Sequence, residues 1–259
     1  MLVVASLQPG MVAMAKSAMH PAQTETLQIE DHDHDAAHGD HAVEQPSSAN
    51  AQKCWNWFNS AEQVRGKGEP LWFAGLTRDI SAQFAIDQRR IYAAGLSAGG
   101  AAAAVLAETY PDIFAAIGVH SGLACGAARD MTSAFMAMGG KPQRQRPEDN
   151  AARALVPTIV FHGDRDTTVH PRNGADVVAR AKAIADLQTL TETHTIRGRS
   201  VTRSLYRDKR GNTVIEDWVV HGAGHTWSGG NAAGSYVDAK GPDASREMLR
   251  FFLAHSLAK

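Results

Sequence analysis

Short apolar runs alternate with stretches of helical periodicity from Gln45 to the C-terminus. Apolar and β-branched runs predict strands, and apolar residues spaced three and four apart predict helices. The segments with β-character are Arg90–Ala94, Ile113–Val119, Pro157–Phe161, Thr191–Tyr206 and Thr213–Val220. The predicted helices are the alanine-rich stretch that ends at Thr109, Trp72–Ile86, Asp176–Leu187 and Asp243–Leu257. This alternation indicates an α/β fold with a mostly parallel sheet, covered by helices on both faces, whose sites form at the carboxyl ends of strands.

Residues 1–44 differ in character from residues 45–259, so we treat them as a separate, atypical amino-terminal segment. Asp31–His41 alternates His and Asp without a helix or strand period. Its charges favour a solvated, disordered tail, and the alternative is binding of a divalent metal ion. Met1–Ala15 is mildly apolar, but it lacks a basic start and Gln8-Pro9-Gly10 interrupts it, so it makes a poor signal peptide.

Composition narrows the class of protein. A hydrophobic content of 44% with 20% charged residues is typical of a globular domain. A formal net charge of -1 gives no electrostatic footprint for nucleic acid or an anionic membrane. No apolar run approaches the roughly 20 residues that a membrane-spanning helix needs. Two cysteines, Cys54 and Cys125, could form one disulfide or remain two buried thiols.

Gly95-Leu96-Ser97-Ala98-Gly99 lies between a predicted strand and a predicted helix. A G-x-S-x-G sequence in that setting is typical of a nucleophile elbow, whose strained turn lifts the serine hydroxyl clear of the sheet. Glycine at positions 95 and 99 avoids collisions in so sharp a turn. The backbone N–H of Ala98, directly after Ser97, is then expected to be one donor of an oxyanion hole.

A serine nucleophile needs a base, usually histidine, which a carboxylate orients. On this kind of sheet the order along the chain is serine, then aspartate or glutamate, then histidine. The strand Pro157–Phe161 runs into a turn that contains both Asp164 and Asp166, and the residues alone do not choose between them. A later strand ends near His221 and a glycine-flanked histidine, His225, and the flanking glycines favour His225 as the base.

Several motifs in this order resemble the polyhydroxybutyrate-depolymerase-type esterases, an α/β-hydrolase family with feruloyl and acetylxylan esterase-like members. The matching stretches are Cys54–Phe58, Gly95–Gly100, His162-Gly163-x-x-Asp166 and Gly224–Gly230. The resemblance covers the chain from about Gln45 onward. It implies Ser97 as nucleophile, Asp166 as the orienting acid and His225 as base, without cofactor or metal. Asp164 is then expected to be structural, capping its turn.

Other polar and aromatic residues have two interpretations each. His120 and His162 either line the pocket or are hydrogen-bonded structural histidines. Trp55, Trp57 and Trp227 either form an apolar acyl-chain or aromatic-acid subsite or pack in the core, and the position of Trp227 beside the base favours the subsite. The sequence identifies no partner for the remaining histidines considered, which are His20, His170, His194 and His255.

The chain departs from the family pattern before Gln45, where a Leu-His-Gly-Cys-like motif that supplies the second oxyanion donor is missing. We therefore expect that the amino-terminal strands of the fold are missing or replaced, and hypothesise a misread or frame-shifted start. The predicted function is a serine carboxylic-ester hydrolase, acting through an acyl-enzyme on small or polymeric polyester, feruloyl or acetyl esters. Alternatives are a catalytically impaired binding protein and an acyltransferase. The resemblance implies an extracellular location, with no nucleic-acid partner.

Overall fold

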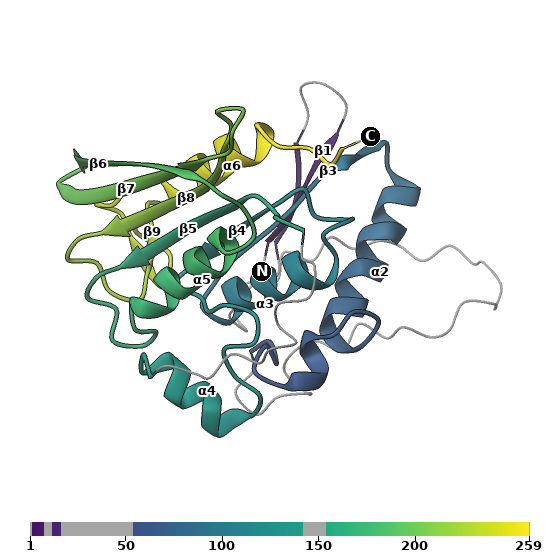
Figure 1. Ribbon diagram of the computed structural model, residues 1–259, viewed down its shortest axis with the longest axis horizontal. Coiled ribbons are helices and arrows are strands. Elements are labelled where there is room, and N and C mark those ends of the chain that lie inside the picture. Colours follow the sequence, from purple (N-terminus) through teal and green to yellow (C-terminus); the bar gives the residue numbers. More distant parts are fainter. Residues whose placement is uncertain (1, 8–11, 17–53, 142–153, 259) are drawn as a thin grey trace.

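A central sheet of eight strands organises the chain in the computed structural model, which describes residues 2–7, 12–16, 54–141 and 154–258 (Figure 1). The strand order is β2-β1-β3-β4-β5-β8-β7-β6. The bounds are β1 Leu2–Leu7, β2 Val12–Lys16, β3 Ile86–Leu96, β4 Ala116–His120, β5 Thr158–Gly163, β6 Gln188–Ile196, β7 Arg199–Arg207 and β8 Thr213–Val220. The four central strands β3, β4, β5 and β8 run parallel, while β7 and β6 continue the sheet antiparallel. The predicted α/β fold is confirmed.

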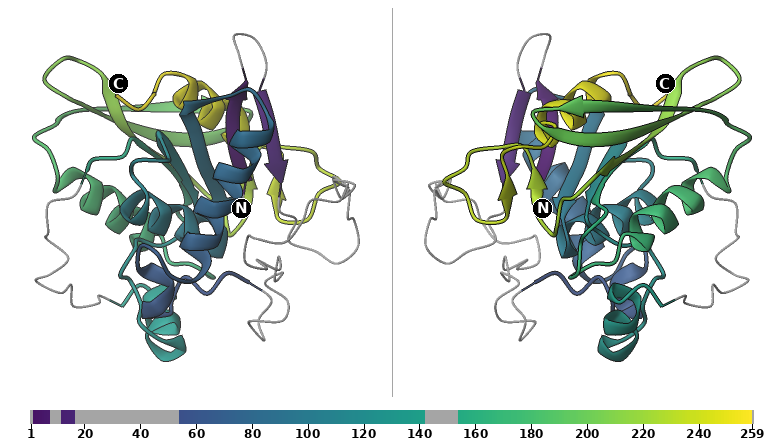
Figure 2. Two further views of the ribbon diagram at one scale, coloured as in Figure 1. Left: turned by 90° about the vertical axis from the view of Figure 1, so that its right-hand side faces the viewer. Right: turned by 90° about the vertical axis from the view of Figure 1, so that its left-hand side faces the viewer.

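Helices pack on both faces of the sheet (Figure 2). They are the 3-10 helix η1 Ser60–Gln63, α2 Gly68–Gln83, α3 Ala98–Thr109, α4 Met131–Met138, α5 Arg172–Lys182 and α6 Ala244–Leu253. The first core cluster contains Phe73 of α2 and Val177 of α5, and the second is formed against α6, where Phe252 stacks on Tyr92 with ring centroids 5.0 Å apart. Two short parallel strands, β9 Trp227–Ser228 and β10 Val237–Asp238, form a separate small sheet.

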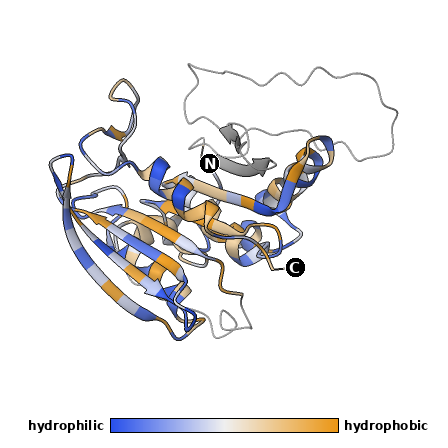
Figure 3. Ribbon diagram, turned by 90° about the horizontal axis from the view of Figure 1, so that it is seen from above, coloured by the Kyte–Doolittle hydropathy of each residue, from blue (hydrophilic) through white to orange (hydrophobic). Residues whose placement is uncertain are grey.

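Burial along the strands follows their place in the sheet. Every residue of β4 and β5 is buried, as expected for parallel strands covered on both faces, whereas most of β6 is exposed at the sheet edge. Figure 3 shows mainly hydrophilic residues, with scattered apolar ones, along the strands of this outer hairpin, whereas the core residues are apolar.

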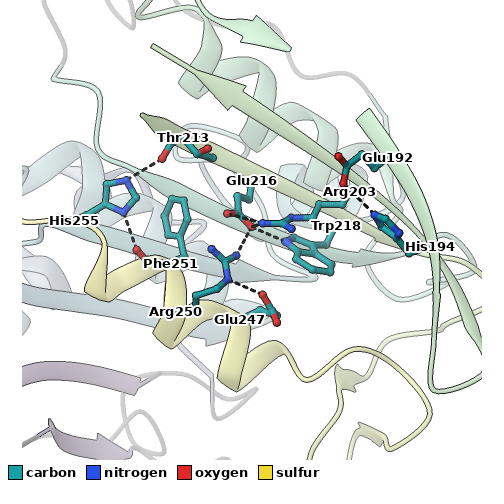
Figure 4. Close-up of polar contacts among 10 residues, drawn as sticks. All are labelled: Glu192, His194, Arg203, Thr213, Glu216, Trp218, Glu247, Arg250, Phe251 and His255. Atoms are coloured by element: carbon teal, nitrogen blue, oxygen red, sulfur yellow. Dashed lines mark hydrogen bonds and ion pairs between the residues drawn. The ribbon is translucent and has the colours of Figure 1, made fainter. Parts of the chain in front are cut away.

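A buried carboxylate joins the closing helix α6 to the outer strands (Figure 4). Glu216 of β8 is 1% exposed. It accepts hydrogen bonds from Arg203 Nη2 at 3.1 Å, Arg250 Nη2 at 2.7 Å and Trp218 Nε1 at 3.1 Å. The Arg203 guanidinium also lies 4.7 Å from the centre of the Trp218 ring. Satisfying a buried charge with several donors in this way offsets the cost of removing it from water.

The predicted strands and helices are present, but several begin or end at other residues than expected. The helix expected over 176–187 spans Arg172–Lys182, and the closing helix expected to end at Leu257 ends at Leu253. The helix expected over 72–86 ends at Gln83, and Ile86 begins β3. The strand expected from Ile113 begins at Ala116, because residues 111–113 form a turn. The β-character of 191–206 belongs to two strands, which a turn at Arg197 and Gly198 connects; both have positive φ, 50° and 85°, as a tight hairpin requires.

Within the amino-terminal segment, β1 pairs antiparallel with both β2 and β3, so β1 lies beside the strand that leads to Ser97. The His/Asp-rich stretch 31–41 lies outside the described residues. In the part of the chain that the structure describes, no helix combines the length and apolar character needed to cross a membrane.

Candidate active site

Ser97 occupies the sharp turn between β3 and α3, with φ 57° and ψ -120°. Such a conformation costs a non-glycine residue about 1–3 kcal/mol and persists only where the surroundings enforce it. The Ser97 N–H donates to the His120 carbonyl at 2.9 Å, and its own carbonyl accepts from Ala101 N at 3.0 Å. Strand and helix meet so closely here that a Cβ on Gly95 would lie 2.4 Å from the carbonyl carbon of Gly99. The turn is therefore held from both sides.

Asp166 follows β5, and its side chain is fully buried. One carboxylate oxygen accepts the backbone N–H of Thr168 at 2.9 Å and of Val169 at 2.8 Å, and the other lies 2.8 Å from His225 Nδ1. Burial opposes ionisation of this carboxyl, but hydrogen bonds from His162, His225 and Val169 outweigh it and hold its pKa well below the usual range. Asp166 is therefore a buried anion at neutral pH.

His225 lies in the loop after β8, where its side chain is 13% exposed. Because Nδ1 donates to Asp166, the neutral ring leaves Nε2 as the nitrogen that can take up a proton. Among the described residues, no hydrogen bond joins the Ser97 hydroxyl to this ring. Such contacts are often long in unliganded enzymes and tighten when substrate binds. Ser97 and His225 both follow the carboxyl ends of strands that run parallel in the same sheet.

Asp164 forms a second carboxylate–imidazole pair. Its Oδ2 lies 2.8 Å from His221 Nδ1, and its Oδ1 accepts the Gly222 N–H at 2.6 Å. His221 Nε2 in turn lies 2.8 Å from Thr202 Oγ1. The carboxylate thus bridges to the loop after β8, where the sequence suggested a cap on its own turn. With side chains 37% and 38% exposed, this pair is far more accessible than Asp166 and His225.

The helix that follows Ser97 supplies a candidate oxyanion donor. Ala98 is the first residue of α3, so the helix itself gives its N–H no acceptor. The helix dipole adds partial positive charge at this end.

The three tryptophans predicted as possible substrate contacts differ in their surroundings. Trp55 and Trp57 are each 6% exposed and belong to the core cluster, where Trp55 packs 4.8 Å from the ring of Phe73. Trp227 is only partly buried, stacks on His120 at 4.9 Å and donates its Nε1–H to Ser245 Oγ at 3.1 Å. Only Trp227 therefore stays a candidate for a substrate contact.

Within the described residues, His162, His120 and the two cysteines pack inside the fold. His162 is buried and bonds the Val169 carbonyl through Nε2 at 2.8 Å. His120 is buried beside Ser97, a proximity that spacing could not reveal because it depends on strand order. In the described part of the chain no disulfide joins Cys54 to Cys125, and Cys125 Sγ lies 3.8 Å from Gln63 Oε1.

The chain matches a known protein family over more than half of its length. The family model described as esterase PHB depolymerase matches residues 30–202. The chain belongs to this esterase family. The match begins inside the segment 1–44 that hydrophobic patterning set apart from the esterase domain.

Similar proteins include a polyester depolymerase and a feruloyl esterase by name. Poly(3-hydroxyalkanoate) depolymerase C of Paucimonas lemoignei is 32% identical over 192 residues, which are 70% of this chain and 46% of the relative. Feruloyl esterase B of Thermothelomyces thermophilus is 27% identical over 195 residues, 70% of this chain and 66% of the relative. The chain thus spans about half the length of the first and less than two thirds of the second.

The fold has a counterpart among solved structures. The acetyl xylan esterase from Aspergillus awamori superposes with a TM-score of 0.59 and 17% identity, covering 78% of this chain and 73% of that one. At this identity the likeness concerns the fold alone.

Proposed function

We propose that this chain is a serine carboxylic-ester hydrolase in which Ser97, Asp166 and His225 form the catalytic triad. The observation that carries the proposal is the buried 2.8 Å contact between Asp166 and His225, at the same sheet edge as the strained Ser97 turn. Membership of an esterase family, and the depolymerase and feruloyl esterase names of two relatives, support the reaction class.

In the proposed mechanism His225 Nε2 takes the proton of the Ser97 hydroxyl as the oxygen attacks the ester carbonyl carbon. The buried Asp166 anion stabilises the imidazolium that forms and keeps the ring in the productive tautomer. The Ala98 N–H donates to the oxyanion of the tetrahedral intermediate; losing one such donor typically costs about 100- to 1000-fold in rate.

The intermediate then collapses, the alcohol oxygen takes the proton from His225, and the acyl group stays on Ser97. A water molecule attacks the acyl-enzyme with His225 again as base, which releases the acid and regenerates the serine. Trp227, partly exposed beyond His225, is the proposed apolar contact for the acyl or aromatic part of the ester.

A fluorophosphonate probe and an ester panel test this proposal. Wild-type protein should be labelled and should hydrolyse p-nitrophenyl acetate, while Ser97→Ala should lose labelling and at least about 10,000-fold in kcat. Absence of labelling in folded wild-type protein would favour the binding-protein alternative. Adding an alcohol acceptor distinguishes a transferase, which forms a new ester, from a hydrolase.

The substrate class and location belong to the same proposal. The names of the relatives suggest polyhydroxyalkanoate oligomers, methyl ferulate and acetylated xylan as the panel, and we propose that one of these ester types is preferred. The extracellular location implied by the family resemblance is tested by assaying culture supernatant against washed cells.

A further inference from the structure

His120 contacts both halves of the proposed catalytic machinery. It is the last residue of β4 and is 1% exposed. Its backbone carbonyl accepts the N–H of Ser97 at 2.9 Å. Its ring nitrogen Nε2 lies 2.9 Å from the backbone N of Ser228, three residues after His225. One side chain and its own carbonyl therefore connect the nucleophile turn to the loop that carries the base.

The contact with Ser228 fixes the protonation state of the ring. A backbone N–H can only donate, so Nε2 of His120 must be an acceptor and the proton resides on Nδ1. Nδ1 lies 3.3 Å from the Ser121 hydroxyl oxygen, which can accept a hydrogen bond from the Nδ1–H. Burial, aided by the nearby His162 and His225 rings, lowers the pKa of His120 to about 3. The charge of Asp166 opposes this shift but does not outweigh it. The ring is therefore neutral over the pH range in which an esterase works.

Two aromatic side chains also stack against the ring. Phe161 stacks on it with centroids 5.7 Å apart and interplanar angle 12°, and Trp227 lies 4.9 Å away at 26°. Ser228 is held on its other side, where its hydroxyl donates to the Pro242 carbonyl at 2.8 Å. These stacking contacts restrict the orientation of the ring, and Trp227 packs directly against it.

We infer that His120 is a positioning residue, which sets the separation of Ser97 and His225 through its carbonyl and its neutral Nε2. The inference rests on the proposed esterase function. Within the described residues, no hydrogen bond joins the Ser97 side chain to His225. The surrounding residues must therefore align the two side chains. A misplacement of about 1 Å between reacting groups can cost around 100-fold in rate.

Substitutions at position 120 separate the acceptor from the ring shape. His120→Phe keeps a flat ring that can stack against Phe161 and Trp227 but removes the acceptor for the Ser228 N–H. We count active sites by fluorophosphonate labelling carried to completion and divide the rate of p-nitrophenyl acetate hydrolysis by that number. The resulting kcat should fall about 100-fold, while KM should change less than about threefold. His120→Gln restores an acceptor and should recover at least about tenfold of that loss.

The matched control is His255→Phe, the same substitution at a histidine whose ring contacts the carbonyls of Phe251 and Thr213 away from the site. It should lower the melting temperature and leave kcat unchanged. Wild-type kcat in folded His120→Phe, or no recovery in His120→Gln, would overturn the positioning role.

If His120→Phe does not fold, His120→Gln is compared with His120→Asn, whose amide is one methylene shorter. Equal kcat in these two variants overturns the inference, and a difference of at least about tenfold in favour of Gln supports it. Wild-type protein that neither labels nor hydrolyses esters would instead refute the esterase proposal itself.

Discussion

Two carboxylate–imidazole pairs lie in the same two loops, and their surroundings give them different capacities. Asp166 with His225 and Asp164 with His221 have the same 2.8 Å separation. The Asp166 side chain is fully buried, whereas those of the second pair are more than a third exposed. Exposed ion pairs are worth only about 0–1 kcal/mol because water screens them, so the buried pair holds its ring more strongly than the exposed pair does.

The two aspartates therefore respond differently to the same substitution. Asp166→Asn keeps the shape of the side chain but favours the wrong histidine tautomer, and should lower kcat about 10,000-fold. Asp164→Asn keeps an acceptor for the Gly222 N–H and should change kcat less than about threefold. Initial rates with p-nitrophenyl acetate measure both variants. Equal losses would show that the Asp164 pair shares the catalytic role.

The sequence could predict the residues at this scale only where local context is sufficient. Ser97 follows from a motif between a strand and a helix, and its positive φ matches that prediction. The choice between Asp164 and Asp166 depends on burial, which two positions in one turn do not reveal. His120 was open to two interpretations, because its contacts with Ser97 and Ser228 arise only when distant strands come together.

At the scale of elements, the pattern of apolar residues predicted the central strands and the main helices, because each of them buries a run or a face of apolar side chains. It missed α4, whose 8 residues are too few to show a period and which begins instead with a capping box between Asp130 and Ser133. The ends of elements were also displaced by local chemistry, as at residues 111–113, where a turn precedes β4. The periodicity of apolar residues indicates which side chains are buried. The residues of caps and turns determine where a helix or strand begins and ends.

Two glycine-to-alanine substitutions contrast the elbow with an ordinary helix. At Gly95 the new Cβ would lie 2.4 Å from the Gly99 backbone, so Gly95→Ala should separate β3 from α3 and cost at least about 2 kcal/mol. At Gly75, inside α2, no atom lies within 4 Å, and Gly75→Ala should stabilise by about 0.5–1 kcal/mol. Urea unfolding measures both. Similar effects at the two positions would contradict the close approach at the elbow.

The first turn of α2 contains a carboxyl that should make stability depend on pH. Burial, partly offset by the N–H of Asn56 and reinforced by Glu62, raises the pKa of Glu69 to about 7. The folded protein therefore binds a proton that the unfolded chain releases near pH 4, so the stability from this group is lost as pH rises from about 4 to 7.

Glu69→Gln cannot ionise and should not lose this stability. The free energy of unfolding of the wild type should fall relative to Glu69→Gln by about 1–3 kcal/mol between pH 4.5 and pH 8. Urea titrations at several pH values measure the difference. Parallel pH curves for the two proteins would show that Glu69 is not titrating in this range.

At the scale of the whole molecule, the loops that carry the proposed catalytic residues depend on strands that neighbouring layers hold in place. Helix α6 contacts β3, β4 and β5, the strands that precede the candidate site, and Glu216 joins it to the outer strands through Arg203 and Arg250. These residues come from three elements and form one connected network around a buried charge (Figure 4). The amino-acid pattern predicts each element but not this connection, because it requires the helix to lie across the sheet.

Removing the charge at the centre of this network should loosen the closing helix. Glu216→Gln leaves Arg203 and Arg250 facing a neutral amide, and because both guanidiniums keep some contact with water we expect a loss of about 2–3 kcal/mol, below that of a fully buried pair. Glu192→Gln, which removes an exposed partner of His194, should change stability by less than about 0.5 kcal/mol. Urea unfolding followed by tryptophan fluorescence compares the two. Equal stability of both variants would refute the anchoring role of Glu216. Since Glu216 lies outside the proposed catalytic residues, kcat per labelled site should fall only if α6 also holds the loops of Ser97, Asp166 and His225 in place.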